Sequence, residues 1–108
     1  MALTSQATGT TTTDGTEQTL VSANATAGVW IFVIDTTNLA NGDAIELRVK
    51  AKVLTGGSVL LIYLVSYAHA QSEPVKISVP VPSLYAITIT LKRVAGTDRA
   101  YDWNAMTL

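Results

Sequence analysis

Cysteine is absent from this sequence of 108 residues, and charged and aromatic residues are scarce. The missing cysteines exclude disulfide bonds, thiol chemistry and cysteine-ligated metals. Asp, Glu, Lys and Arg make up 14% of the chain and leave a formal net charge of -1, too little to attract nucleic acid or an anionic membrane by a long-range field. We therefore expect neither a nucleic acid nor a membrane among its partners.

A long hydrophobic run is also missing. The longest uninterrupted apolar stretch, Val59 to Val65, is closed by Gly56 and Gly57 on one side and by Ser66 on the other. A membrane-spanning helix needs about 20 consecutive apolar residues, so this stretch cannot cross a bilayer. The opening MALTSQATG has no basic and no apolar region, so we expect no secretory signal.

What is present indicates β-structure. Between Asp43 and Val53, apolar residues alternate strictly with charged ones, which predicts a strand with one solvated face. Gly56 and Gly57 then supply a tight turn, so the apolar run folds back antiparallel on this strand. Its apolar residues on both faces suggest a central strand covered on each side, and a face left uncovered within the monomer must be covered by a partner.

Other segments complete a chain of seven predicted strands joined by turns. Pro80 predicts that one of them lies at a sheet edge or ends there, and Ala95 to Asp98 is expected to be a hairpin turn. The further predicted strands are 17–22, 29–34, 75–81, 85–91 and 99–106. The prediction is one all-β domain over residues 17–108, an antiparallel β-sandwich or small barrel of jelly-roll or immunoglobulin-like type.

The first 16 residues are rich in Thr and Ser. Residues 4–16 contain no large apolar side chain, so they cannot bury enough surface to offset the entropy of ordering. We expect residues 1–16 to be a flexible arm that orders when it docks on a partner.

Residues for chemistry are few, and we predict no catalytic, cofactor-binding or metal-binding residue and no enzymatic activity. His69 is the only histidine and lacks metal-ligand spacing, which favours a structural or rim role. Neither Asp98 with Asp102 nor Asp43 with Glu46 has a signature of paired catalytic acids, so these carboxylates are interpreted as solvated charges.

Aromatic residues offer one alternative. Tyr101 and Trp103 lie on the last predicted strand and could stack on sugars if exposed, as in a carbohydrate-binding module, although a place in the core is favoured for both. Candidate partner-binding residues are Thr10, Thr11, Thr12, Thr13, Tyr67, His69, Tyr101 and Trp103.

Four segments, NGDAIELRVKAKV, SYAHAQ, PVKISVPVP and LKRVAGTDRAYDWNAM, together resemble small virion proteins of tailed bacteriophages. The resemblance implies a structural protein without enzymatic activity, assembled into the virion in the host cytoplasm. It implies a capsid decoration or cement protein that binds the major capsid protein lattice as a homo-oligomer. The alternatives are a tail or neck component, or a carbohydrate-binding β-sandwich module that recognises a surface glycan.

Overall fold

The computed structural model describes residues 3–108 and folds them into nine strands without a helix. The strands are β1 (Thr4–Thr12), β2 (Gln18–Asn24), β3 (Gly28–Asp35), β4 (Ala44–Ala51), β5 (Leu60–Ala68), β6 (Val75–Ile77), β7 (Val81–Ser83), β8 (Ile87–Ala95) and β9 (Ala100–Thr107). Consequently no helix in this range could span a bilayer.

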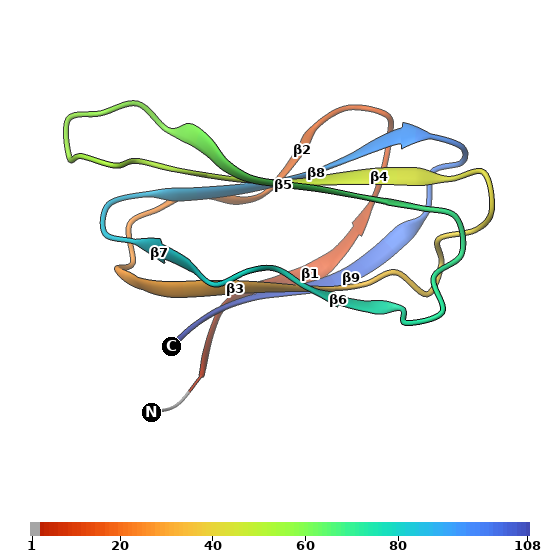
Figure 1. Cartoon of the computed structure of the whole chain (residues 1–108), viewed down its shortest axis with the longest axis horizontal. Coiled ribbons are helices and arrows are strands. Elements are labelled where there is room, and N and C mark those ends of the chain that lie inside the picture. The colour runs from red at the N-terminus through yellow and green to blue at the C-terminus, as the bar shows by residue number, and fades with distance from the viewer. Residues whose placement is uncertain (1–2) are drawn as a thin grey trace.

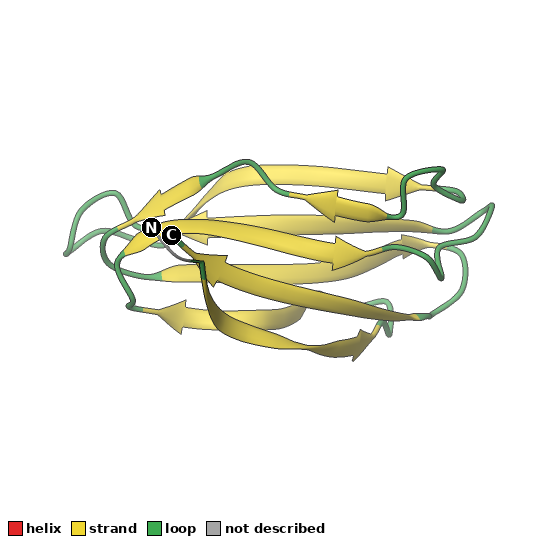
Figure 2. Cartoon of the chain, turned by 90° about the horizontal axis from the view of Figure 1, so that it is seen from below, coloured by secondary structure: helices red, strands yellow, loops and turns green. Residues whose placement is uncertain are grey.

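The strands form two antiparallel sheets that pack face to face (Figure 1). One sheet has the order β1-β9-β3-β6, with β7 also paired to β3, and the other has the order β2-β8-β4-β5. Figure 2 views the sandwich along the perpendicular direction and shows its strands running close to parallel with the long axis. The predicted antiparallel sandwich is confirmed.

The strand order is that of a jelly roll. The pairs β4–β5, β3–β6/β7, β2–β8 and β1–β9 form one long antiparallel hairpin whose tip is the β4–β5 loop. Rolling this hairpin up places β9 beside β3 and β8 beside β4, which gives two four-stranded layers. In this description β6 and β7 are one edge strand interrupted at Pro80.

Alternation along the strands produces the core. Every second residue of β3, β4, β8 and β9 points between the sheets, as the period of two requires. Trp103 of β9 stacks on Phe32 of β3 with ring centroids 5.9 Å apart. The largest fully buried side chains are Trp30, Tyr101, Phe32, Ile34, Ile45, Ile87, Ile89 and Leu91.

The flexible N-terminal arm is not confirmed. Thr4–Thr12 is β1, and it pairs with β9 from Thr4↔Thr107 to Thr12↔Ala100. β-branched threonine favours strands, and backbone pairing with β9 supplies the order that apolar burial alone would not. The part of the predicted arm at residues 1–2 lies outside the described residues.

Three further predictions about strands need correction. The apolar strand β5 is not central but forms the edge of its sheet, paired only with β4. The predicted strand 75–81 is broken into β6 and β7, because proline lacks the N–H that a continuous ladder needs. The segment Ala95–Asp98 is not a hairpin turn, because it carries the chain from β8 in one sheet to β9 in the other.

Candidate interaction surface

The edge strand β5 has apolar residues on both faces but only one covered face. Tyr63, Val65 and Tyr67 point inward and pack against the core. Leu61 and Leu64 point outward beside Lys50 and Arg48 of β4, and each is 49% exposed. Nothing in the described chain covers these outward side chains.

Exposed apolar residues gather on the side of the sandwich formed by β5, β6 and β7. We call this surface the open side. It holds ten of the thirteen large apolar residues that are exposed in the described chain. They are Val53, Leu54, Leu60, Leu61, Ile62, Leu64, Val75, Ile77, Val79 and Leu84. Such a concentration is unusual for the surface of a soluble monomer and is typical of an interaction surface.

Charge is correspondingly absent along β5. The 20 residues from Val53 to Ser72 include no Asp, Glu, Lys or Arg. The cations beside β5 belong to its neighbours: Arg48 and Lys50 of β4 lie opposite Leu64 and Leu61, and Lys76 Nζ of β6 is 5.7 Å from the centre of the Tyr67 ring. β5 therefore combines apolar side chains with no charge of its own.

A hollow of about 360 Å³ lies at one end of the open side, where the two sheets separate. Its walls come from the end of β4, from β5 and from β7, and they are mainly aliphatic. The lining residues are Ala51, Lys52, Val53, Ile62, Pro82 and Leu84. With Lys52 as its only titratable residue, this hollow can accept apolar side chains but brings no acid and base together.

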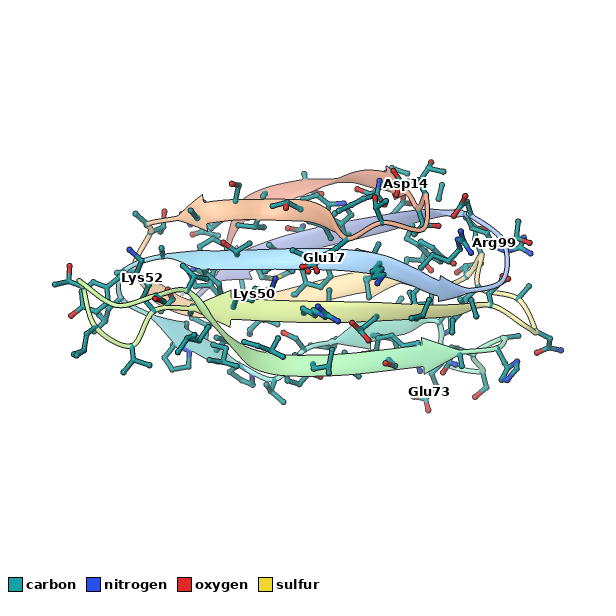
Figure 3. The ribbon with its side chains drawn as sticks, turned by 90° about the horizontal axis from the view of Figure 1, so that it is seen from above. Asp14, Glu17, Lys50, Lys52, Glu73 and Arg99 are labelled. Atoms are coloured by element: carbon teal, nitrogen blue, oxygen red, sulfur yellow. The ribbon has the colours of Figure 1, made fainter. Side chains whose placement is uncertain are left out.

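The outer face of the β2-β8-β4-β5 sheet is different in character away from β5. Glu17 accepts from Lys50 Nζ at 2.7 Å and from Arg48 at 3.2 Å, and Glu46 also pairs with Arg48. The hydrogen bond from Lys50 is the main cause that lowers the pKa of Glu17. Figure 3 shows Glu17 and Lys50 over the middle of this sheet, while β5 lies along its edge.

Asp43 is the most tightly held carboxylate. It accepts hydrogen bonds from the Thr97 N–H at 2.9 Å, from the Ala40 N–H at 3.1 Å and from Arg99 Nε. The Thr97 bond, followed by the Arg99 and Ala40 bonds, lowers the pKa of Asp43 to about 2. Asp43 thus joins the loop before β4 to the β8–β9 connection, which is a structural role rather than a catalytic one.

His69 directly follows β5, and its contacts give it a structural role. Its backbone N–H donates to the Asp43 carbonyl, and its Nδ1 accepts from the Gly42 N–H, both at 2.9 Å. Its φ of 64° is in the left-handed region, where histidine is enriched among non-glycine residues. Both imidazole and backbone are therefore used to tie β5 to the loop before β4.

The four candidate threonines lie on β1 or directly after it, and only two are exposed. Thr10 is exposed and donates to Asp102, and Thr12 is exposed at the end of β1. Thr11 is half-buried and accepts from Trp103 Nε1 at 2.9 Å, and Thr13 is buried against Arg99. These threonines belong mainly to the scaffold.

The structure brings none of the other candidate residues into a common exposed site. Tyr101 is 1% exposed and Trp103 is 9% exposed, so the core placement of both is confirmed and a stacking platform for sugars is not formed. Tyr67 points inward from β5, and burial raises its pKa. Among residues 3–108, no group of three or more His, Asp or Glu side chains is arranged to hold a metal ion.

The residues that sequence analysis missed are the exposed aliphatic residues of the open side. The apolar residues on both faces of β5 were visible in the sequence, together with the absence of charge from Val53 to Ser72. The strand order, which decides whether β5 is central or at an edge, was not visible there.

Comparison with known proteins gives no relative. No family model, no curated protein and no solved structure matches this chain.

Proposed function

We propose that this chain is a non-enzymatic structural protein of a virion, a decoration or cement protein that binds and stabilises the major capsid protein lattice. The observation that carries the proposal is the open side, a mainly apolar surface around the uncharged strand β5 on a well-packed jelly roll. Exposed apolar surface of this extent is typical of a site where another protein binds.

The chemistry of the described surface supports a binding role over a catalytic one. All four carboxylates of the possible acid pairs have a partner within the fold: Asp43 pairs with Arg99, Glu46 with Arg48 and Asp98 with Arg93. Asp102 accepts a hydrogen bond from Thr10. The hollow at the end of the open side is lined by aliphatic residues and one lysine. A site for acid–base or nucleophilic catalysis would need convergent polar groups in such a hollow.

Two further observations agree with the proposal without carrying it. The resemblance of four sequence segments to small virion proteins of tailed bacteriophages is part of this proposal, and jelly rolls are frequent among viral capsid proteins. Jelly rolls also occur in lectins, so the fold alone does not decide between a capsid role and a sugar-binding role. The burial of Tyr101 and Trp103 removes the residues on which the sugar-binding alternative depended.

Quantitative mass spectrometry of purified virus particles tests the proposal. The copy number of this chain is measured relative to the major capsid protein in the same particles. Roughly hundreds of copies per particle fit a protein that covers the lattice, whereas roughly a dozen indicate a neck or tail position with its lower symmetry. Absence from the particles would contradict a virion role of any kind.

A further inference from the structure

The backbone of β5 is available for pairing along one side. β5 is an edge strand, so the N–H and C=O groups of every second residue point away from β4. No other strand of the described chain pairs with β5 on that side. It is nine residues long and contains neither proline nor a charged residue, although these are the usual means by which proteins block an edge. Its one irregularity lies near Ile62, opposite Val49 and Lys50, and leaves 63–68 regular.

The other three sheet edges are protected or polar. β6 and β7 are three residues each and are separated by Pro80. β2 has two irregularities in its pairing with β8 and includes Ala23 with a φ of 43°. β1 is long but consists of Thr, Ser, Gln, Ala and Gly. Only β5 therefore combines a long free edge with apolar side chains.

We propose that a second copy of this chain covers β5, with the two β5 strands paired antiparallel about a two-fold axis at Leu64. Leu64 is the midpoint of Leu60–Ala68, and this register sets Tyr63 opposite Val65 and Ile62 opposite Ser66 of the second copy. The product is one continuous sheet of eight strands, with β2 of each copy at its two ends. The proposal deepens the proposed function by naming the partner at β5, and it rests on that function only for the expectation of an oligomer.

Charge and symmetry favour a second copy over another protein. In a contact with two-fold symmetry, a charged side chain near the axis lies beside the same charge of the second copy and is repelled by it. β5 contains no charged residue, so its pairing with a second β5 meets no such repulsion. Next to the axis this register keeps inward side chains together, because Tyr63 and Val65, one residue on either side of Leu64, both point inward. The irregularity near Ile62 limits this matching to residues 62–66, since beyond it the outward Leu61 would face the inward Tyr67. Leu64 then meets Leu64 of the second copy on the outer face of the sheet.

Pairing of the two β5 strands involves only part of the open side. Val75 and Ile77 lie opposite Asp35 and Val33 on the outer face of the other sheet, so this pairing does not cover them. The contact consists of the free backbone edge of β5 and of its exposed aliphatic side chains, which are Leu60, Leu61, Ile62 and Leu64. A contact of this limited size fits a dimer that dissociates on dilution.

Sedimentation equilibrium of the full chain tests the pairing. We expect the wild type to form a dimer at roughly 100 μM and to dissociate on dilution. In the variant Leu64→Glu the introduced carboxylate lies beside Arg48 within its own copy, so the monomer should fold. In the dimer it would meet the same carboxylate of the second copy, and we expect at least about 100-fold weaker dimerisation.

Val94→Glu is the matched control, because Val94 is 51% exposed on β8 and does not belong to the open side. It should dimerise as the wild type does. Circular dichroism and thermal melting of both variants show whether each is folded. A wild type that stays monomeric at all concentrations, or a folded Leu64→Glu variant that dimerises normally, would overturn the proposal.

Disulfide formation tests the position of the two-fold axis. Because the chain has no cysteine, a single Leu64→Cys substitution gives one defined crosslink. Directly opposed residues of antiparallel strands have Cβ atoms about 4.5–5.5 Å apart, close enough for a disulfide after a small shift. Under mild oxidation Leu64→Cys should form a covalent dimer, while Ser22→Cys on the opposite edge of the same sheet should not.

Equal crosslinking of the two cysteine variants would overturn the pairing at Leu64. The dimer tests use purified protein, whereas the virion role is tested on particles. If the purified protein dimerises but is absent from virus particles, the virion role is contradicted and the pairing of β5 is not. A monomer that is found in particles would contradict the pairing alone and assign the open side to another virion protein.

Discussion

Asp43 shows how a single residue connects distant parts of this fold. Its carboxylate accepts from Ala40, Thr97 and Arg99, although Arg99 lies 56 positions away in the chain. The side chain is 4% exposed, so these bonds are shielded from water. These hydrogen bonds stabilise the charged carboxylate of Asp43 in the folded state, so the free energy of unfolding depends on pH.

We predict that the protein loses stability in acid and that Asp43 contributes to the loss. Its folded pKa of about 2 lies below the ordinary value of 3.8, so its contribution is complete above about pH 4 and decreases as the pH falls toward 2. Urea unfolding across this range should show a smaller decrease for Asp43→Asn than for the wild type. The variant should also be less stable at neutral pH.

Asp35 provides the comparison for this experiment. Its pKa is lowered by bonds from Thr37 in its own loop, without an arginine partner. Asp35→Asn should therefore retain more of the dependence on pH than Asp43→Asn does. Identical curves for the wild type and Asp43→Asn would contradict the role assigned to Asp43.

Gly96 is required by the same cluster. Its φ is +85°, and an added Cβ would lie 2.2 Å from Asp43 Oδ1 and 2.8 Å from the Gly42 carbonyl. We predict that Gly96→Ala lowers the free energy of unfolding by about 3 kcal/mol or more, through backbone strain and this clash. Gly56→Ala, where the added Cβ meets nothing within 4 Å, should change it by only about 0.5 kcal/mol. Chemical denaturation of both variants would contradict this account if the two losses were equal.

At the scale of the elements, β1 is the clearest difference between sequence and structure. Its inward residues are small: an added Cβ at Gly9 would lie 3.4 Å from the Trp103 ring, and Thr11 accepts from the indole N–H. β1 thus closes the core over Trp103 without contributing a large apolar side chain. This explains why hydrophobic content alone predicted an arm.

Deleting residues 1–12 distinguishes a strand from an arm. The deletion removes β1 (Thr4–Thr12), which uncovers β9 and the edge of Trp103, so the free energy of unfolding should fall by on the order of several kcal/mol. Urea denaturation followed by tryptophan fluorescence measures the loss. Unchanged stability after the deletion would show that the segment contributes no structure to the sandwich.

Local pattern predicted some elements and left others undetermined. The alternation over Asp43 to Val53 predicted β4 and its inward face, and the glycine turn predicted the antiparallel pairing with β5. The place of β5 at an edge depends on which strands the rolled hairpin brings together, and that is not local information. For the same reason Asp43 was considered with its neighbour Glu46, although its partner is Arg99.

At the scale of the whole molecule, the open side makes the jelly roll asymmetric. The outer face over β4 and β8 has ion pairs between Glu17, Arg48 and Lys50, whereas the side formed by β5, β6 and β7 is apolar. This asymmetry underlies both the proposed assembly role and the proposed pairing of two copies.

Hydrogen–deuterium exchange of β5 is the measurement that tests this account most directly. The exchange of Leu60–Ala68 is followed at protein concentrations above and below the dissociation constant of the dimer, with β1 as an edge strand in the same molecule for comparison. The account predicts slow exchange in β5 at high concentration and faster exchange on dilution, while β1 does not change. Exchange in β5 that is equally fast at every concentration would contradict it.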